Sequence, residues 1–109
     1  MSRRVILDEC LPRKLKRILG DNRVETAFEA GLAGLKNGEL LSAIGGTYEV
    51  FVTVDKALAD QQNLSALTFG IVLIRVPSNA IEDLLPLATA LRSAIAGVRS
   101  GNLIEVSGY

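Results

Sequence analysis

The stretch Val50-Phe51-Val52-Thr53-Val54-Asp55 is an aliphatic, β-branched run that ends in an acid. A run of this length and composition is typical of a buried strand in a parallel sheet. A second apolar run, Val5-Ile6-Leu7, ends in Asp8 and Glu9 in the same way. Because ligands of open α/β sheets bind outside the carboxyl ends of the strands, the sequence predicts that these acids meet at one edge of the sheet.

Acids that meet at a sheet edge repel one another unless they share a counterion. Two carboxylates about 4 Å apart repel by on the order of 4 kcal/mol at an effective dielectric of 20, so the cluster must take up protons or hold a cation. A hard divalent cation is the simplest occupant. Thr53 points to the same side of its strand as Asp55, where its hydroxyl is expected to hold Asp55 or a metal-bound water. A turn or helix cap would explain either aspartate alone, but two of them, with Glu9 beside Asp8, favour a metal site.

The composition narrows the class of protein. The chain has 109 residues, the size of one domain, and its 12 basic and 12 acidic residues cancel. It contains no histidine, which excludes histidine-based acid–base catalysis, Ser-His triads and His-ligated zinc. The single cysteine, Cys10, cannot form an intrachain disulfide and has no base to activate it, which fits a reducing cytosol. No stretch resembles a signal peptide or a membrane span of ~20 residues, so we expect a cytoplasmic protein.

Apolar runs and amphipathic stretches alternate along the chain. The expected strands cover about residues 5–7, 23–28, 49–54, 71–76 and 103–106. The expected helices cover about residues 11–19, 37–44 and 80–98. Asn37 is expected to cap the second helix, and Asn79 with Glu82 forms a capping-box pattern before the third. Pro86 is expected to kink that third helix or to mark a later start near Asp83. The alternation predicts an α/β fold with a mostly parallel sheet of about five strands and helices on both faces.

Other polar residues are weaker candidates for the site. Glu39 lies in the first turn of the second predicted helix, where the helix dipole alone would favour an acid. Asn37 is either a cap or a neighbour of a ligand. The helix after Asp8 carries a basic face that is able to meet phosphates or is simply solvated: Arg13, Lys14, Lys16 and Arg17. A donor-rich run suits nucleotide contacts or an ordinary loop: Gln61, Gln62 and Asn63. The chain has no glycine-rich phosphate-binding motif.

Three blocks of the sequence together resemble a PIN-like domain and cover nearly the whole chain, residues 1–109, as one domain. They are VILDECLPRKL (5–15), GLAGLKNGELL (31–41) and FVTVDKALADQQNL (51–64). This family is similar to the toxin ribonucleases of bacterial toxin–antitoxin modules. The resemblance implies a three-layer α/β/α fold and a metal-dependent nuclease whose catalytic, metal-holding acids are Asp8, Glu39 and Asp55. The resemblance and the residue pattern together give accessory roles to Glu9, Asn37, Thr53 and Asp60.

The segment after the third predicted strand departs from the family pattern. Many PIN-like proteins continue as T-x-D-x-D-F, whereas Ala57 and Leu58 stand in the last two places here. One metal-site acid is therefore missing. Asp60 is close in the sequence but out of register with that pattern. Three acids suffice for one Mg²⁺ or Mn²⁺ whose shell is completed by waters, while a site for two ions is not expected.

The expected function is therefore hydrolysis of RNA by a metal-activated water, in the toxin component of a toxin–antitoxin module. The expected partners are RNA, an antitoxin protein and a second copy of the chain, because an Ala/Leu-rich helix over residues 80–98 offers aliphatic surface. RNA contacts are assigned to six residues: Arg13, Lys14, Arg17, Gln61, Gln62 and Asn63. Two alternatives stay open. One is a PIN-like binding module without activity. The other is a phosphoacceptor receiver domain, which needs a lysine after its last strand that residues 106–109 do not provide.

Overall fold

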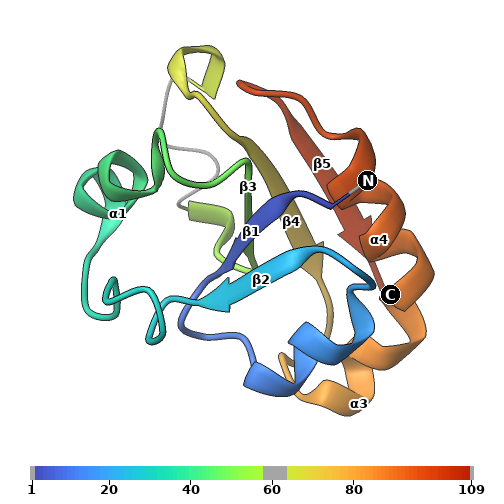
Figure 1. Ribbon diagram of the computed structural model, residues 1–109. Helices are drawn as coiled ribbons and strands as arrows, with labels where there is room; N and C mark the ends of the chain where they lie inside the picture. Colours follow the sequence, from blue (N-terminus) through green and yellow to red (C-terminus); the bar gives the residue numbers. More distant parts are fainter. Residues whose placement is uncertain (1, 58–63, 109) are drawn as a thin grey trace.

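The structure is a computed structural model that describes residues 2–57 and 64–108, in which strands alternate with helical segments (Figure 1). The strands are β1 (Arg4–Leu7), β2 (Arg23–Thr26), β3 (Val50–Thr53), β4 (Gly70–Arg75) and β5 (Leu103–Ser107). The α-helices are α1 (Asn37–Ile44), α3 (Ile81–Leu84) and α4 (Ala88–Gly97). Shorter 3-10 helices are η1 (Arg13–Ile18), η2 (Leu64–Ala66) and η3 (Leu85–Leu87). Asp60, Gln61, Gln62 and Asn63 were predicted as site residues, and they lie outside the described residues together with Leu58.

The five strands form one sheet in the order β2-β1-β3-β4-β5, and every neighbouring pair is parallel. This confirms the predicted α/β fold with a parallel sheet of five strands. The chain leaves β1 for β2 on one side, and β3 lies on the other side of β1. The pair β1/β3 is therefore the topological switch point, the place where open α/β sheets bind ligands beyond their carboxyl ends.

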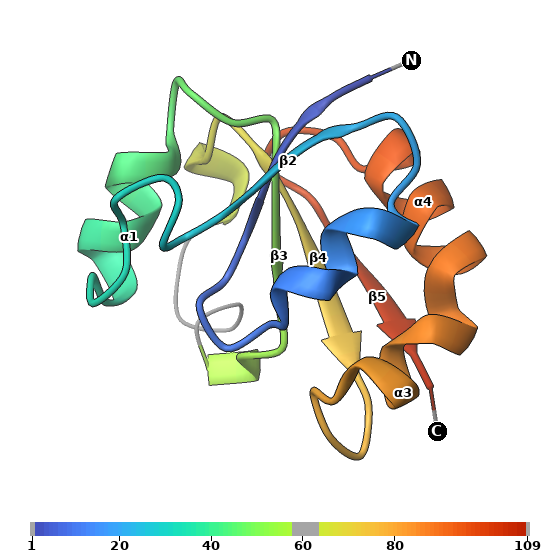
Figure 2. The same ribbon diagram turned by 60° about the horizontal axis from the view of Figure 1, so that its bottom comes forward.

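Helices cover both faces of the sheet and give three layers (Figures 1 and 2). Leu7 and Val52 belong to the core that the sheet shares with η1, α3 and α4, whereas Ile6 and Phe51 belong to the core that it shares with α1. This alternation follows from the pleat, which points successive side chains to opposite faces. All these strand residues are fully buried because each face has its own helical layer. The α/β/α layering agrees with the prediction.

The helices differ from the prediction in two places. The expected helix over residues 80–98 is divided into α3, η3 and α4, because Pro86 lacks the N–H that a continuous helix needs and the chain tightens into a 3-10 turn around it. The helix predicted over residues 11–19 is the shorter η1.

The two predicted helix N-caps each differ by one residue from the N-caps in the structure. Asn37 is the first residue of α1, and the N-cap position belongs to Lys36. Ala80, and not Asn79, precedes α3. Asn79 therefore does not cap α3. Within residues 2–57 and 64–108, no helix has the length and apolar character that crossing a membrane requires.

Candidate functional site

Asp8 and Thr53 meet at the carboxyl end of the switch point. Asp8 follows β1 directly and Thr53 is the last residue of β3, and the Asp8 amide still donates to the carbonyl of Val52 at 2.9 Å. The Thr53 hydroxyl donates to Asp8 Oδ2 at 2.6 Å, and this bond is buried. Asp8 Oδ1 accepts the amide of Glu9 at 2.8 Å. The parallel pairing of two strands thus brings the two residues together and fixes the orientation of the Asp8 carboxylate, in a residue that is 9% exposed.

Thr53 also joins the second predicted acid to this network. The backbone amide of Asp55 donates to Thr53 Oγ1 at 3.0 Å, so one hydroxyl connects Asp8 with the start of the segment after β3. Thr53 was predicted to hold Asp55 or a metal-bound water, and the bond that it donates goes to the carboxylate of Asp8. Asp55 itself is exposed at the rim of this edge. A buried acid and an exposed acid therefore follow the two strands of the switch point.

Cys10 lies close enough to both acids to feel their charges. Although the residue is exposed, partial desolvation of its thiol, the negative charge of Asp8 and, to a smaller extent, that of Asp55 raise the pKa of Cys10 above its ordinary value. The thiolate is the form of cysteine that attacks substrates and binds metals. A raised pKa disfavours that form, and the absence of a nucleophilic role for Cys10 stays a prediction.

Asn79 extends the site toward β4 and was not predicted to belong to it. Its side-chain amide donates to the carbonyl oxygen of Cys10, which joins the loop after β4 to the loop after β1. The signal in the sequence was the same as for the aspartates, a polar residue shortly after a buried strand. The capping-box pattern with Glu82 instead predicted that Asn79 caps a helix. Residues that follow β1, β3 and β4 are thus connected at one edge of the sheet.

The structure leaves the predicted metal site with fewer acids in contact than expected. Glu9 is exposed, and its Oε2 accepts the amide of Gly34 at 3.2 Å. Glu39 is exposed in the first turn of α1. Among the described residues, no three Asp, Glu or Cys side chains are grouped closely enough to hold a metal ion together. The described contacts therefore connect Asp8, Thr53 and Asp55, while Glu39 in the metal shell stays a prediction.

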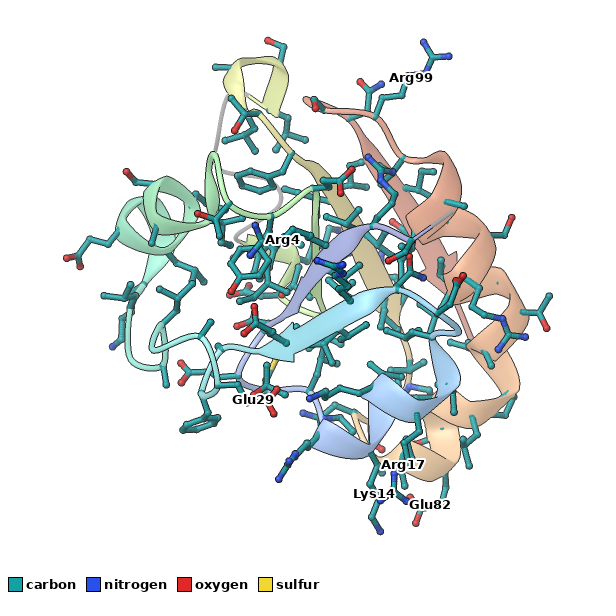
Figure 3. All side chains as sticks on the ribbon, in the orientation of Figure 1. Arg4, Lys14, Arg17, Glu29, Glu82 and Arg99 are labelled. Atoms are coloured by element: carbon teal, nitrogen blue, oxygen red, sulfur yellow. The ribbon has the colours of Figure 1, made fainter. Side chains whose placement is uncertain are left out.

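The predicted basic face is present on η1, but part of its charge is neutralised. Lys16 Nζ lies 2.8 Å from Glu29 Oε1, and Arg13 Nη2 lies 3.7 Å from Glu29 Oε2. Lys14 and Arg17 are exposed, and Figure 3 shows both side chains extending from η1 at the end of the molecule where Glu82 of α3 lies. A surface hollow of about 490 Å³ is lined by these four basic residues of η1. Lys14 and Arg17 are therefore the cations of this face that are best placed to meet a phosphate.

Comparison of the chain with protein-family models, curated proteins and solved structures found no match.

Proposed function

We propose that the protein is a metal-dependent endoribonuclease that hydrolyses RNA phosphodiesters at the β1/β3 switch point. The observation that carries the proposal is the buried carboxylate of Asp8, which is hydrogen-bonded by Thr53 at the position where parallel sheets bind ligands. Burial of a carboxylate is costly unless it is paired or coordinates a metal. Asp8 has hydrogen-bond donors but, among the described residues, no ion-pair partner. A divalent cation would supply the missing positive charge.

The donor atoms of the edge fit Mg²⁺ or Mn²⁺. Each Asp8 oxygen accepts one hydrogen bond in the structure, which leaves each of them a lone pair for a cation. Mg²⁺ commonly binds through one or two carboxylates, several waters and the phosphate oxygens of its substrate. Asp8 and Asp55 would therefore suffice as protein ligands, and the proposal keeps Glu39 as a third. When bound, the ion would lower the pKa of a water that attacks phosphorus and would stabilise charge on the phosphate.

The residues of the chain have distinct tasks in this proposal. Thr53 orients the Asp8 carboxylate, since its hydroxyl donates to Oδ2 and is itself fixed by the Asp55 amide. Lys14 and Arg17 would bind backbone phosphates of the RNA. With no histidine in the chain, proton transfer falls to water and carboxylates. The resemblance supports a toxin role and an antitoxin partner. The Ala/Leu-rich residues 80–98 support a homodimer, and the single cysteine fits a cytoplasmic location. All four belong to the proposal.

The test is cleavage of single-stranded RNA with Mg²⁺ or Mn²⁺, and with EDTA as the metal-free control. Asp8→Asn and Asp55→Asn should each lower the rate at least about a hundredfold, because each removes charge from a small ligand set. Asp21→Asn is a matched control, since Asp21 is exposed and lies before β2, at the amino end of the sheet. Activity that survives EDTA would contradict the proposed mechanism. Absence of cleavage of varied RNAs with either metal would favour the binding module.

A phosphoacceptor receiver domain is the second candidate, because the strand order found here is shared with receiver domains and Asp55 follows the central strand β3. Incubation with a small phosphodonor and Mg²⁺ tests it directly. Phosphorylation of the wild type that is lost in Asp55→Asn would favour the receiver. The described residues after β5 provide no lysine for that chemistry, and for this reason the nuclease is preferred.

A further inference from the structure

We propose that the pocket beside Phe28 binds one unpaired RNA base, which stacks on the phenyl ring and donates an amino N–H to Glu9. The inference rests on the proposed ribonuclease function and names how the substrate is held. The pocket has a volume of about 360 Å³ and is lined by Glu9, Leu11, Arg13, Thr26, Phe28 and Glu29. It lies between the loops that follow β1 and β2, next to the site of Asp8.

Phe28 is the first observation that supports this pocket as a binding site. Its side chain is 69% exposed, although most large apolar side chains of the described chain are buried. It follows β2 by two residues, in a turn whose geometry is set by other residues: the amide of Glu29 donates to Thr26 Oγ1 at 3.1 Å, and the amide of Thr26 donates to Glu29 Oε1 at 2.9 Å. The ring is therefore presented by a hydrogen-bonded turn. A planar, exposed ring of this kind is the platform on which proteins stack single-stranded bases.

The polar groups of the pocket define the chemistry of the occupant. Two carboxylates, Glu9 and Glu29, line it together with one cation, Arg13, which lies 3.7 Å from Glu29 Oε2. Because Glu29 is paired in this way, Glu9 is the charge that would repel a phosphate and attract a group with N–H donors. Both Glu29 oxygens already accept bonds from Lys16, whereas Glu9 Oε1 has no hydrogen-bond partner among the described residues. A carboxylate accepts from the exocyclic amino group of a base such as cytosine. We therefore expect cytosine, adenine and guanine to bind better than uracil, which has no amino group.

The surroundings of the pocket favour RNA as the source of that base. Arg13 lines both the pocket and the basic hollow of η1, and Glu9 is adjacent in sequence to Asp8. Arg13 thus connects the pocket with the basic hollow, and Glu9 follows the proposed metal ligand Asp8 directly in the chain. A strand whose phosphates cross the basic hollow would place a neighbouring base at Phe28. The base must be unstacked to enter, so the proposal predicts a single-stranded substrate.

The chain contains no tryptophan, so Phe28→Trp creates a single fluorescent reporter in the pocket. In EDTA, where the proposed cleavage cannot occur, oligo-A and oligo-C should quench this fluorescence more strongly than oligo-U. Leu85→Trp is the matched control, because Leu85 is also an exposed apolar residue, at 48%, but lies on η3. The fluorescence of Leu85→Trp should not change.

Phe28→Ala should weaken binding of oligo-C by roughly 5- to 150-fold, the range expected for loss of one base stack, and Phe28→Tyr should retain the binding. Glu9→Ala should remove the preference over oligo-U.

These measurements test the base pocket and the nuclease activity separately. Quenching of the Phe28→Trp reporter without metal-dependent cleavage by the wild type would support the base pocket and contradict the nuclease. Cleavage by the wild type, together with unchanged fluorescence of the Phe28→Trp reporter and equal RNA affinity in Phe28→Ala, would overturn the base pocket alone. Sedimentation of the wild type and of Phe28→Ala tests whether a second copy of the chain occupies the pocket instead of a base. If the wild type self-associates and Phe28→Ala does not, the pocket binds a second copy of the chain and the inference is wrong. No binding of any oligonucleotide would overturn both proposals.

Discussion

At the amino end of β1, Arg3 has an acid and two backbone carbonyls as partners, whereas at the carboxyl end of the same strand Asp8 has no cation beside it in the described chain. Arg3 Nη1 donates to the carbonyls of Ile95 at 2.8 Å and Val98 at 2.7 Å, and its Nε lies 3.4 Å from Glu49. The Asp8 carboxylate accepts bonds from Thr53 and Glu9 only, among the residues that the structure describes. One end of the strand therefore uses its charge to tie the sheet to the last turn of α4. The other end keeps a negative charge available.

The charges at the two ends of β1 have different roles, one in stability and the other in the proposed activity. A guanidinium at the carbonyl end of a helix satisfies groups that the helix cannot satisfy itself, which stabilises the folded state. A buried carboxylate without a cation does the reverse, since its charge is only partly compensated by hydrogen bonds. Changes at the amino end should therefore alter stability, and changes at the switch point should alter activity.

Thr53→Val should lower the rate of RNA cleavage, and its effect should be larger than that of any variant at the amino end of β1. It removes the hydroxyl that orients Asp8, and loss of such a positioning bond typically costs roughly 10- to 100-fold in metal affinity or activity. The concentration of Mg²⁺ that gives half the maximal rate should rise in Thr53→Val. Thr53→Ser keeps the hydroxyl and should remain close to the wild type. Equal metal dependence in both variants would show that the Thr53–Asp8 bond has no part in the site.

Arg3→Ala should lower the free energy of unfolding by about 2 kcal/mol, because two charge-assisted hydrogen bonds to the end of α4 are lost. Denaturation by urea measures the change. Arg99→Ala is the matched control, since Arg99 is exposed and Figure 3 shows it pointing away from the body of the molecule just after α4. The specific cleavage rate of folded Arg3→Ala should equal that of the wild type. A loss of activity as large as that expected for Asp8→Asn would show that the amino end of β1 also contributes to activity.

Tyr48→Phe should lower stability by about 1 kcal/mol at neutral pH, since the Tyr48 hydroxyl donates to Glu25 at 2.8 Å. Burial, then the bond to Glu25 and its charge, raises the pKa of Tyr48 to about 12. The pKa is higher in the folded than in the unfolded state, so this contribution is complete below about pH 10 and is lost as the pH rises toward 12. Urea midpoints of wild type and Tyr48→Phe should therefore converge above about pH 10. Parallel curves up to about pH 12 would contradict this account.

Glu29→Gln should have the smallest effect, which should be present at neutral pH and disappear in acid. Hydrogen bonds from Lys16 and from the Thr26 amide lower the pKa of Glu29 to about 2. A lowered folded-state pKa gives stability that is present above about pH 4.5 and is lost as the pH falls toward 2. The wild type should lose its small advantage over Glu29→Gln in that interval, as followed by thermal unfolding. Salt should reduce the difference further, because the group is exposed.

The strands and their direction could be predicted because aliphatic runs alternate with amphipathic stretches, a pattern that parallel sheets require. The order of the strands could not, since nothing local in residues 5–7 states that β2 lies on one side and β3 on the other. Pro86 was recognised as a break, but whether the helix bends or divides depends on how η3 packs. At the site, Asp8 and Asp55 were found from their positions after buried strands. The bond from Thr53 to Asp8 joins residues on two strands, and only the register of the sheet reveals it.

Thr53 follows Asp8 by 45 residues, and this separation also sets a delay during synthesis of the protein. A ribosome that adds about 5–20 residues each second needs roughly 2–9 s to pass from one to the other. Until β3 has emerged and paired with β1, Asp8 has neither the hydroxyl that orients it nor the second acid of the edge. A chain interrupted before residue 53 would therefore carry no assembled site. In a nuclease this delay would protect the messenger and the ribosome that are producing it from premature cleavage.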